Sequence, residues 1–508
     1  MELQAHYKNR PTRPRQIDSL EAKAQDVLRF ISSCRNLFRP INRLPLEILS
    51  LIARDVVKGD SDVVEMVPLT HVCRHWRQSL ISIPENWTLI SDVNEHMAAV
   101  CLQRAKAAPL EITLFSSSLS ESPLFPRIIE PYVHNARTLE ARYILTVEHL
   151  TAIFPDFPRS MPMLESISLR PTTEESQEGN WSINPFEPGF AHTLKHLSLT
   201  GIPLYPTLIG IRTLTELTLH WPKGDICLDT LLDFLEGNNS LESADLSIEF
   251  TEPPPHNPIR RVKKNQLRHL SIRCNNIACA QALITTVSLR RGAALEIEIR
   301  DENATLVDTL PNVSTAHLLD PPLPTSFEFT YRWHDVLVGV LLRGPGGKFS
   351  FSKCPRAKDP FPDIHLLPLT NAREFRLLHF EEAGRTVPEP PVFRPSLFPS
   401  LETLAIECNP KFETDVRRVL SSLLLNPTSS SLLKTLAFLN CTLSEELMEE
   451  ITKFASERKK TLTSTWLYRV LIVHKDGEFL SAASIHKLKN YVRVVEARMG
   501  SELPEDLT

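Results

Sequence analysis

The sequence predicts an α/β protein in which a small helical module near the N-terminus precedes an irregular solenoid with parallel strands. Amphipathic helical patterns occupy the chain up to residue 92. Beyond residue 100, short Leu-x-x-Leu-x-Leu segments return at intervals of roughly 20 to 32 residues, a period typical of solenoids. The length of 508 residues also exceeds what one small core can fill, so several units or one elongated array are expected.

Composition narrows the possible classes of function. The net charge of −5, from 56 basic and 61 acidic residues, gives no general attraction to nucleic acid or to an anionic membrane. The 40 prolines and only 15 glycines disfavour a nucleotide-binding enzyme, because phosphate-cradling turns need glycine. Nine cysteines without a Cys-x-x-Cys pair, and an N-terminus without an apolar leader, indicate reduced thiols in the cytoplasm or nucleus. We therefore expect no cofactor, metal, nucleic acid or membrane partner.

The first predicted element is an amphipathic helix in which apolar residues recur at spacings of three and four. These residues are Ile17, Leu20, Ala24, Val27, Leu28, Ile31, Cys34, Leu37 and Phe38. Two roles fit such a helix: self-association or docking, and bracing of the next module by covering its exposed face. We favour the brace, because a coiled coil normally needs three or more sustained heptads.

The segment from Ile41 to Asp92 predicts several short helices. Pro45 suits a first helical turn and Glu47 complements the helix dipole, so a helix is expected to start near Leu44. A second amphipathic stripe follows, formed by Leu69, Val72, Cys73, Trp76 and Leu80. About fifty residues cannot bury so many apolar groups internally, so some must face a partner or the rest of the chain.

In order and residue type this segment resembles an F-box. It has a Leu-Pro start, a Val-Cys-Arg-x-Trp-Arg helix and a closing Pro-x-x-Trp at residues 84–87. The resemblance implies that it binds the Skp1-type adaptor of a cullin ubiquitin ligase. The implied adaptor-binding residues are Leu44, Pro45, Ile48, Leu49, Val72, Cys73 and Trp76. The long insert from Lys58 to Asp62 departs from the pattern. Periodicity alone also fits a helical hairpin inside a larger domain, with Trp76 in its core.

The Leu-x-x-Leu-x-Leu segments predict stacked parallel strands. Clear copies begin at Leu164, Leu194, Leu214 and Leu267, and weaker copies at Leu241, Ala372, Leu401 and Leu433. Motif positions one, four and six are expected to point inward, and positions three and five outward. Asn275, Asn409 and Cys441 occupy the ninth position, as in a leucine-rich repeat, which the array resembles. A generic α/β domain with buried leucine strands is the alternative.

The outward positions are candidate target-binding residues, because solenoids commonly present extended binding faces there. Seven polar side chains at or just beyond these positions form the candidate set: His196, Ser198, Glu216, His220, Asp245, His269 and Arg273. Their mixture of polar and mildly charged groups favours a folded or peptide-like protein surface over an apolar small molecule. The alternative for each is an ordinary solvated sheet face.

Four regions depart from the repeat pattern. The stretch 301–371 is rich in proline and glycine and predicts long loops or an interruption. Residues 171–188 and 252–255 fit solvated connectors. A strand over 466–473, a helix over 484–489 and an apolar run at 492–495 predict a terminal cap of different pattern. The expected organisation is therefore a tail and helix (1–40), an F-box (41–92), degenerate repeats (93–443) and a capping region (444–508).

Catalytic motifs are absent or broken. The run Gly344-Pro345-Gly346-Gly347-Lys348 lacks the spacing and hydroxyl of a phosphate loop and predicts a turn. The basic run 260–264 could be a nuclear address or a patch for an acidic partner, but a solvated loop is favoured. We therefore expect a non-enzymatic substrate receptor that holds a cullin ligase core through its adaptor and an unknown protein target through the repeats. The alternatives are a repeat scaffold without a ligase and an enzyme whose site has no recognisable motif.

Overall fold

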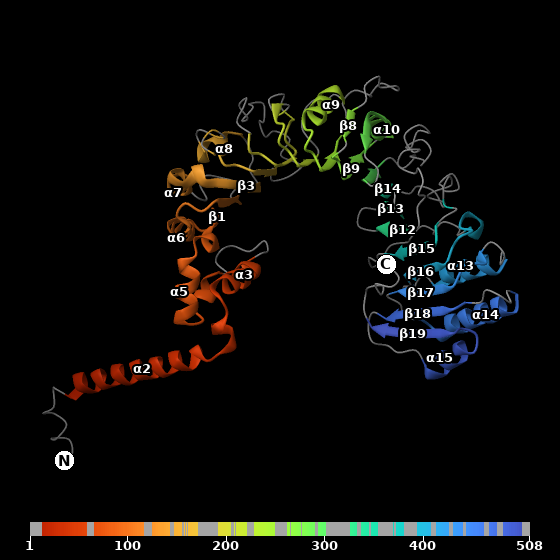
Figure 1. Ribbon diagram of the computed structural model, residues 1–508, viewed down its shortest axis with the longest axis horizontal. Coiled ribbons are helices and arrows are strands. Elements are labelled where there is room, and N and C mark those ends of the chain that lie inside the picture. The colour runs from red at the N-terminus through yellow and green to blue at the C-terminus, as the bar shows by residue number, and fades with distance from the viewer. Residues whose placement is uncertain are drawn as a thin grey trace, which may run out of the picture. The chain divides into compact units, whose positions relative to one another are not determined.

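The structure is a computed structural model, which forms two compact units, residues 1–194 and 195–508 (Figure 1). It describes residues 13–57, 66–115, 124–142, 147–154, 161–170, 192–204, 211–220, 228–248, 262–264, 266–275, 277–289, 293–300, 326–332, 337–344, 347–353, 372–379, 394–407, 413–425, 430–439, 443–461, 467–474 and 481–499, with single residues between some of these ranges. The predicted domain boundaries at 92 and 443 do not coincide with the division between the units.

The first unit is α/β, with helices up to Trp87 followed by strands that alternate with further helices. Its helices are α2 (Arg13–Leu37), η1 (Pro40–Arg43), α3 (Leu46–Val57), α4 (Met66–Thr70), α5 (Arg74–Ser82), η3 (Pro84–Trp87), α6 (Glu95–Ala105), α7 (Phe125–Ile129), η4 (Glu130–Asn135) and α8 (Val147–Ile153). Its strands are β1 (Leu89–Ser91), β2 (Leu110–Leu114), β3 (Ala136–Arg142) and β4 (Ser166–Arg170). Each strand pairs in parallel with the next along the chain.

Trp87 joins the helical module to the sheet of the first unit. It is the last residue of η3, separated from β1 by Thr88 alone, and its side chain is fully buried. The indole Nε1–H donates a hydrogen bond to the carbonyl of Leu80 at 3.0 Å, and the guanidinium of Arg104 on α6 lies 4.2 Å from the ring centroid. Segment 41–92 is therefore continuous with the first strand and is not a separate globule.

Helix α2 does not cover the module, contrary to the brace interpretation. Every described side chain from Ile17 to Ser32 is exposed, including those of the apolar positions. Its contact with the rest of the first unit lies at its C-terminal end, where Asn42 Nδ2 donates to the carbonyl of Asn36 at 2.7 Å. The amphipathic pattern therefore predicts the helix but not what the apolar stripe meets.

The second unit contains a long sheet whose strands follow chain order with one exception. Its strands are β5 (His196–Thr200), β6 (Glu216–His220), β7 (Ser243–Ser247), β9 (His269–Cys274), β11 (Ala294–Ile299), β12 (Ser326–Arg332), β13 (Leu337–Gly344), β14 (Gly347–Lys353), β15 (Glu374–His379), β16 (Thr403–Glu407), β17 (Thr435–Leu439), β18 (Arg469–His474) and β19 (Val494–Met499). The helices are α9 (Leu228–Gly237), α10 (Ile277–Thr286), α13 (Glu413–Leu425), α14 (Glu445–Thr461) and α15 (Ala482–Lys489), with η8 (Pro395–Leu397). In Figure 1, α13, α14 and α15 lie on one side of β16 to β19.

The predicted inward positions of the repeat segments are confirmed. All eight copies begin two residues before a strand, and motif positions one, four and six are buried in every copy. The strands β5, β6, β7 and β9 pair in parallel and in register, as do β15, β16 and β17. Asn275 is half-buried directly after β9, whereas Asn409 and Cys441 lie outside the described residues.

The stretch 301–371 does interrupt the parallel order. Strand β11 pairs in parallel with β14, β14 and β13 pair antiparallel, β13 and β12 pair antiparallel, and β12 then pairs in parallel with β15. Strand β13 ends at Gly344 and β14 begins at its partner Gly347, so the glycine run joins two strands. A phosphate loop would instead join a strand to a helix.

The C-terminal region continues the preceding pattern instead of changing it. Strands β18 and β19 extend the parallel sheet, and α14 and α15 follow β17 and β18. On this part of the sheet the outward positions are also apolar, since Ala405, Ala437 and Leu471 are fully buried and adjacent in register. The polar outward face therefore belongs to β5 through β11, while β16 to β18 bury both faces.

The basic run 260–264 is not a solvated loop where the structure describes it. Residues Val262–Lys264 form β8, which pairs in parallel with β10 (Val287–Leu289). The ammonium of Lys264 is buried and donates to the carbonyl of Asn238 at 2.9 Å. Burial lowers the pKa of Lys264, although Glu236 opposes the shift. Because Lys264 is used internally, the run cannot present all its charges to a receptor.

Candidate functional site

Helix α3 has one buried side and one apolar side that faces outward. Leu49, Ser50 and Ala53 are buried, and Ser50 Oγ donates to Asn86 Oδ1 at 2.6 Å. Ile48 and Leu51, three residues apart and therefore on one side of the helix, are 41% and 60% exposed. An amphipathic helix that only packed on a core would carry polar residues at these two positions.

The structure divides the seven predicted adaptor-binding residues into core and surface. Leu49 and Trp76 are buried core residues, and Leu44 and Cys73 are half-buried. Pro45, Ile48 and Val72 are exposed. Trp76 therefore follows the core alternative of the sequence analysis. The insert from Lys58 to Asp62 lies outside the described residues.

Asn42 holds the start of the module together, and sequence reasoning missed it. Its Oδ1 accepts a hydrogen bond from the indole Nε1–H of Trp76 at 2.7 Å, and the thiol of Cys73 lies 3.9 Å away. Its amide Nδ2 donates to Asn36 at the end of α2. One side chain thus connects three elements, which no local spacing could indicate.

Two further exposed apolar residues were also missed, Leu46 and Leu51. The available signal was the distribution of apolar residues in α3, which occupy more than one stripe. A helix that is apolar around most of its circumference needs contacts on both sides.

The second candidate surface is the polar outward face of β5 to β11. His196 Nδ1 lies 3.0 Å from Glu216 Oε2 on the neighbouring strand, and Ser198 is half-buried on the same face. His196 and Glu216 are direct register partners, whereas His220 is in register with Ser247 and reaches Asp245 diagonally. The predicted residues therefore lie on the same face of neighbouring strands, and their contacts form separate groups.

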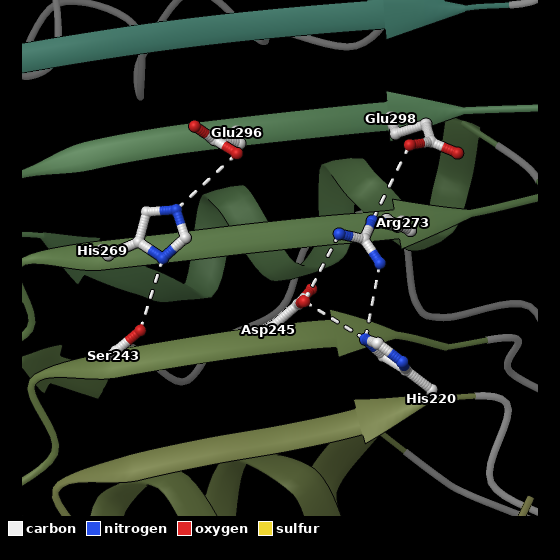
Figure 2. A network of polar contacts seen from close by, with 7 residues as sticks. All are labelled: His220, Ser243, Asp245, His269, Arg273, Glu296 and Glu298. Atoms are coloured by element: carbon white, nitrogen blue, oxygen red, sulfur yellow. Dashed lines mark hydrogen bonds and ion pairs between the residues drawn. The ribbon is translucent and has the colours of Figure 1, made fainter. Parts of the chain in front are cut away.

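Asp245 is the centre of this face (Figure 2). Its Oδ2 lies 3.1 Å from His220 Nε2 on β6 and 3.4 Å from Arg273 on β9. His220 Nε2 can donate to Asp245 or accept from Arg273, which is 3.4 Å away, but it cannot do both with one proton. The shorter contact favours donation to Asp245. Arg273 also reaches Glu298 on β11 at 3.7 Å.

His269 makes a second group of contacts beside the first (Figure 2). Its Nδ1 lies 3.3 Å from Ser243 Oγ, and its Nε2 lies 3.7 Å from Glu296. Glu296 and Glu298 were not predicted, because the sequence has Gly292 and not leucine at motif position one of this strand. The alternation of apolar and acidic residues along β11 was the signal that could have found them.

The pKa of the Asp245 carboxyl is lower than usual. Burial alone would raise it, but the hydrogen bond with His220, the charge of Arg273 and a hydrogen bond with Ser271 together outweigh that effect. The carboxylate is therefore the form that the network stabilises. In chemical terms the face holds fixed charged groups in contact with each other.

We expect Asp245→Asn to weaken this part of the sheet at neutral pH and to have no effect in acid. Because its folded pKa is depressed, the charged network contributes above the unfolded value of 3.8 and is lost as pH falls below it. The side chain is partly exposed, so we expect a loss of about 1 kcal/mol, or about fivefold in the amide protection factors of β7 and β9. Hydrogen exchange at neutral and acid pH measures this.

The control for that substitution is Glu216→Gln, which removes a more exposed carboxylate from the same face. We expect it to change protection by less than about 0.5 kcal/mol. Equal protection in wild type and Asp245→Asn at neutral pH would show that the network does not stabilise the sheet.

Comparison with known protein families finds no match for this sequence, and comparison with curated proteins finds none either. Among the described residues, no group of three or more His, Cys, Asp or Glu side chains is arranged to hold a metal ion. Within the same residues, no helix combines the length and apolar character needed to cross a membrane.

Proposed function

We propose that this protein is a substrate receptor of a Skp1–cullin–F-box ubiquitin ligase, acting in the cytoplasm or the nucleus. In this proposal the module formed by α3, α4, α5 and η3 is the F-box. The observation that carries it is the exposed apolar side of α3 at Ile48 and Leu51. Apolar side chains that stay in water on one side of a short helix are typical of a protein interaction site.

The solvent exposure of two predicted adaptor-binding residues supports the F-box assignment. Ile48 and Val72, which the resemblance assigns to the adaptor, are open to solvent and not covered by this chain's described residues. Leu49 and Trp76 take the complementary role of holding the helices together. A partner helix could therefore bury Ile48 and Leu51 without any rearrangement of the module core.

The repeats of the second unit are proposed to be a degenerate leucine-rich-repeat solenoid that binds the target. Support comes from the motif copies, which each place their three inward positions in the core of a parallel sheet. The outward face from β5 to β11 then presents polar groups, with Asp245 and Arg273 near its centre. Such a face suits a polar protein surface better than an apolar small molecule.

No residue of this chain needs to perform chemistry in the proposed role. A receptor accelerates ubiquitin transfer by holding a target lysine close to the conjugating enzyme, which raises the effective concentration of that lysine. The proposed role involves no cofactor and no metal ion.

Mixing the purified protein with a purified Skp1-type adaptor tests the proposal. We expect a one-to-one complex with a dissociation constant of about 1 μM or tighter, measured by calorimetry. No heat and no complex at adaptor concentrations of about 100 μM would reject the ligase assignment. That result would favour the alternative function, a repeat scaffold that binds proteins without a ligase.

A further inference from the structure

The apolar residues of α2 follow a heptad repeat. Counting Ile17 as position a, the a positions inside the helix are Ile17, Ala24 and Ile31, and the d positions are Leu20, Val27 and Cys34. Phe38 falls on the next a position, one residue beyond the end of the helix. Three consecutive heptads with small or apolar residues at every a and d position form a coiled-coil seam.

The opposite side of α2 is polar. Positions b, c and f hold Asp18, Ser19, Ala22, Gln25, Asp26, Arg29, Ser32, Ser33 and Asn36. Asp26 and Arg29 form an ion pair at 3.2 Å on this outer side. The helix therefore separates its apolar and polar residues as a two-stranded coiled coil requires.

The seam is uncovered among the described residues of this chain. Ile17, Leu20, Val27 and Ile31 are each more than half exposed, as are Leu28 and Phe30 beside the seam. A single helix of 25 residues has little stability of its own in water, because most helix stability in proteins comes from packing of the apolar face. The helix therefore needs a partner that matches its seam.

We propose that α2 pairs with α2 of a second copy of this chain in a parallel, in-register coiled coil. Isoleucine at position a with leucine at position d, as in the first heptad, favours two parallel strands. This pairing brings no like charges together at the edges of the seam. Position g of one helix meets position e of the next heptad in the other, so Lys23 lies against Leu28 and Phe30 against Arg35.

Dimerisation gives each particle two copies of every surface described above. Two outward sheet faces can then engage a target that carries two sites, with an avidity that exceeds the affinity of either face alone. The dimer depends on neither the adaptor nor the ligase, so a test of dimerisation is independent of a test of the proposed function.

Sedimentation of the purified full-length protein without adaptor tests the pairing. We expect a particle of twice the chain mass of 57.6 kDa. The double substitution Leu20→Asp with Val27→Asp places charges in the seam and is expected to weaken the dimer at least 100-fold. The matched control, Ser19→Asp with Gln25→Asp, adds the same charges to the polar side and should remain dimeric. All four side chains are exposed in the single chain, so its fold does not depend on them.

Cys34 reports the orientation of the two helices. In a parallel in-register pair, position d of one helix faces position d of the other, so mild oxidation should join Cys34 to Cys34 of the second copy. We expect a reductant-sensitive dimer on a denaturing gel that disappears in Cys34→Ser. A monomer at all concentrations, or a dimer that survives the Leu20 and Val27 substitutions, would overturn the proposal. A dimer without the Cys34 disulfide would overturn the parallel register.

Discussion

Ile48→Asp combined with Leu51→Asp is expected to weaken binding of a Skp1-type adaptor at least 100-fold, or about 2.7 kcal/mol. In the complex these side chains would be buried against the partner, and a buried carboxylate without a partner is costly. In the free protein both residues face solvent on the outer side of α3, so the module should keep its stability to within about 0.5 kcal/mol. Calorimetric titration measures the affinity, and circular dichroism melting checks the fold.

Two further variants sharpen this test. Val72→Asp changes another predicted contact residue, whereas Val93→Asp makes the same substitution at an equally exposed valine in the turn before α6. We expect Val72→Asp to weaken adaptor binding and Val93→Asp to leave it unchanged. If the Ile48 and Leu51 variant binds the adaptor as tightly as wild type, the outer side of α3 is not the docking surface.

The repeat strands could be predicted from sequence because their signal is local. Within each motif copy, two-residue alternation fixes which side chains enter the core, and the structure places Leu197 and Leu199 inside while His196 and Ser198 face outward. The same alternation predicts the polar face as a set of positions. It could not predict the contacts among them, since Asp245 meets His220 and Arg273 only through the register of neighbouring strands.

The features that sequence reasoning missed depend on contacts between distant segments. Ala405 and Ala437 occupy outward positions, yet they are buried because the opposite side of the sheet is also covered near its C-terminal strands. The reversed order of β12 to β14 follows from pairing partners and not from composition. The prediction of a solvated loop around Lys264 was wrong for the same reason. A basic residue is expected to face solvent unless its carbonyl partners are known, and the carbonyl that Lys264 contacts lies in a distant segment.

The pattern of apolar residues likewise could not separate core residues from exposed contact residues in the N-terminal module. Ile48 and Leu49 are neighbours of similar hydrophobicity, but one faces solvent and the other is fully buried. Trp76 appeared among the adaptor-binding residues because the resemblance places it in the motif, whereas the hydrogen bond with Asn42 assigns it to the core. In a short module whose helices have apolar residues on both sides, periodicity alone cannot distinguish buried residues from exposed contact residues.

Trp87→Ala is expected to destabilise the first unit by about 3 to 5 kcal/mol. The substitution leaves a cavity where a fully buried indole packed, removes the hydrogen bond to Leu80 and withdraws the aromatic face under Arg104. Trp87→Phe keeps most of the ring volume, and the carbonyl of Leu80 retains a donor in Asn86 Nδ2 at 3.3 Å, so we expect a loss of about 1 to 2 kcal/mol. Urea unfolding followed by hydrogen exchange in β1 and β2 measures both.

Measuring adaptor binding by the Trp87 variants also tests whether the buried indole affects the module only through its folding. Trp87 is buried and cannot touch a partner, so it affects binding only through the fraction of molecules whose module is folded. Trp87→Ala should therefore weaken adaptor binding in urea far more than in buffer, whereas Ile48→Asp with Leu51→Asp weakens it equally in both. Tyr468→Ala, an exposed aromatic in the second unit, should change neither quantity by more than about 1 kcal/mol. If Trp87→Ala leaves exchange in β1 and β2 unchanged, the indole does not join the module to the sheet.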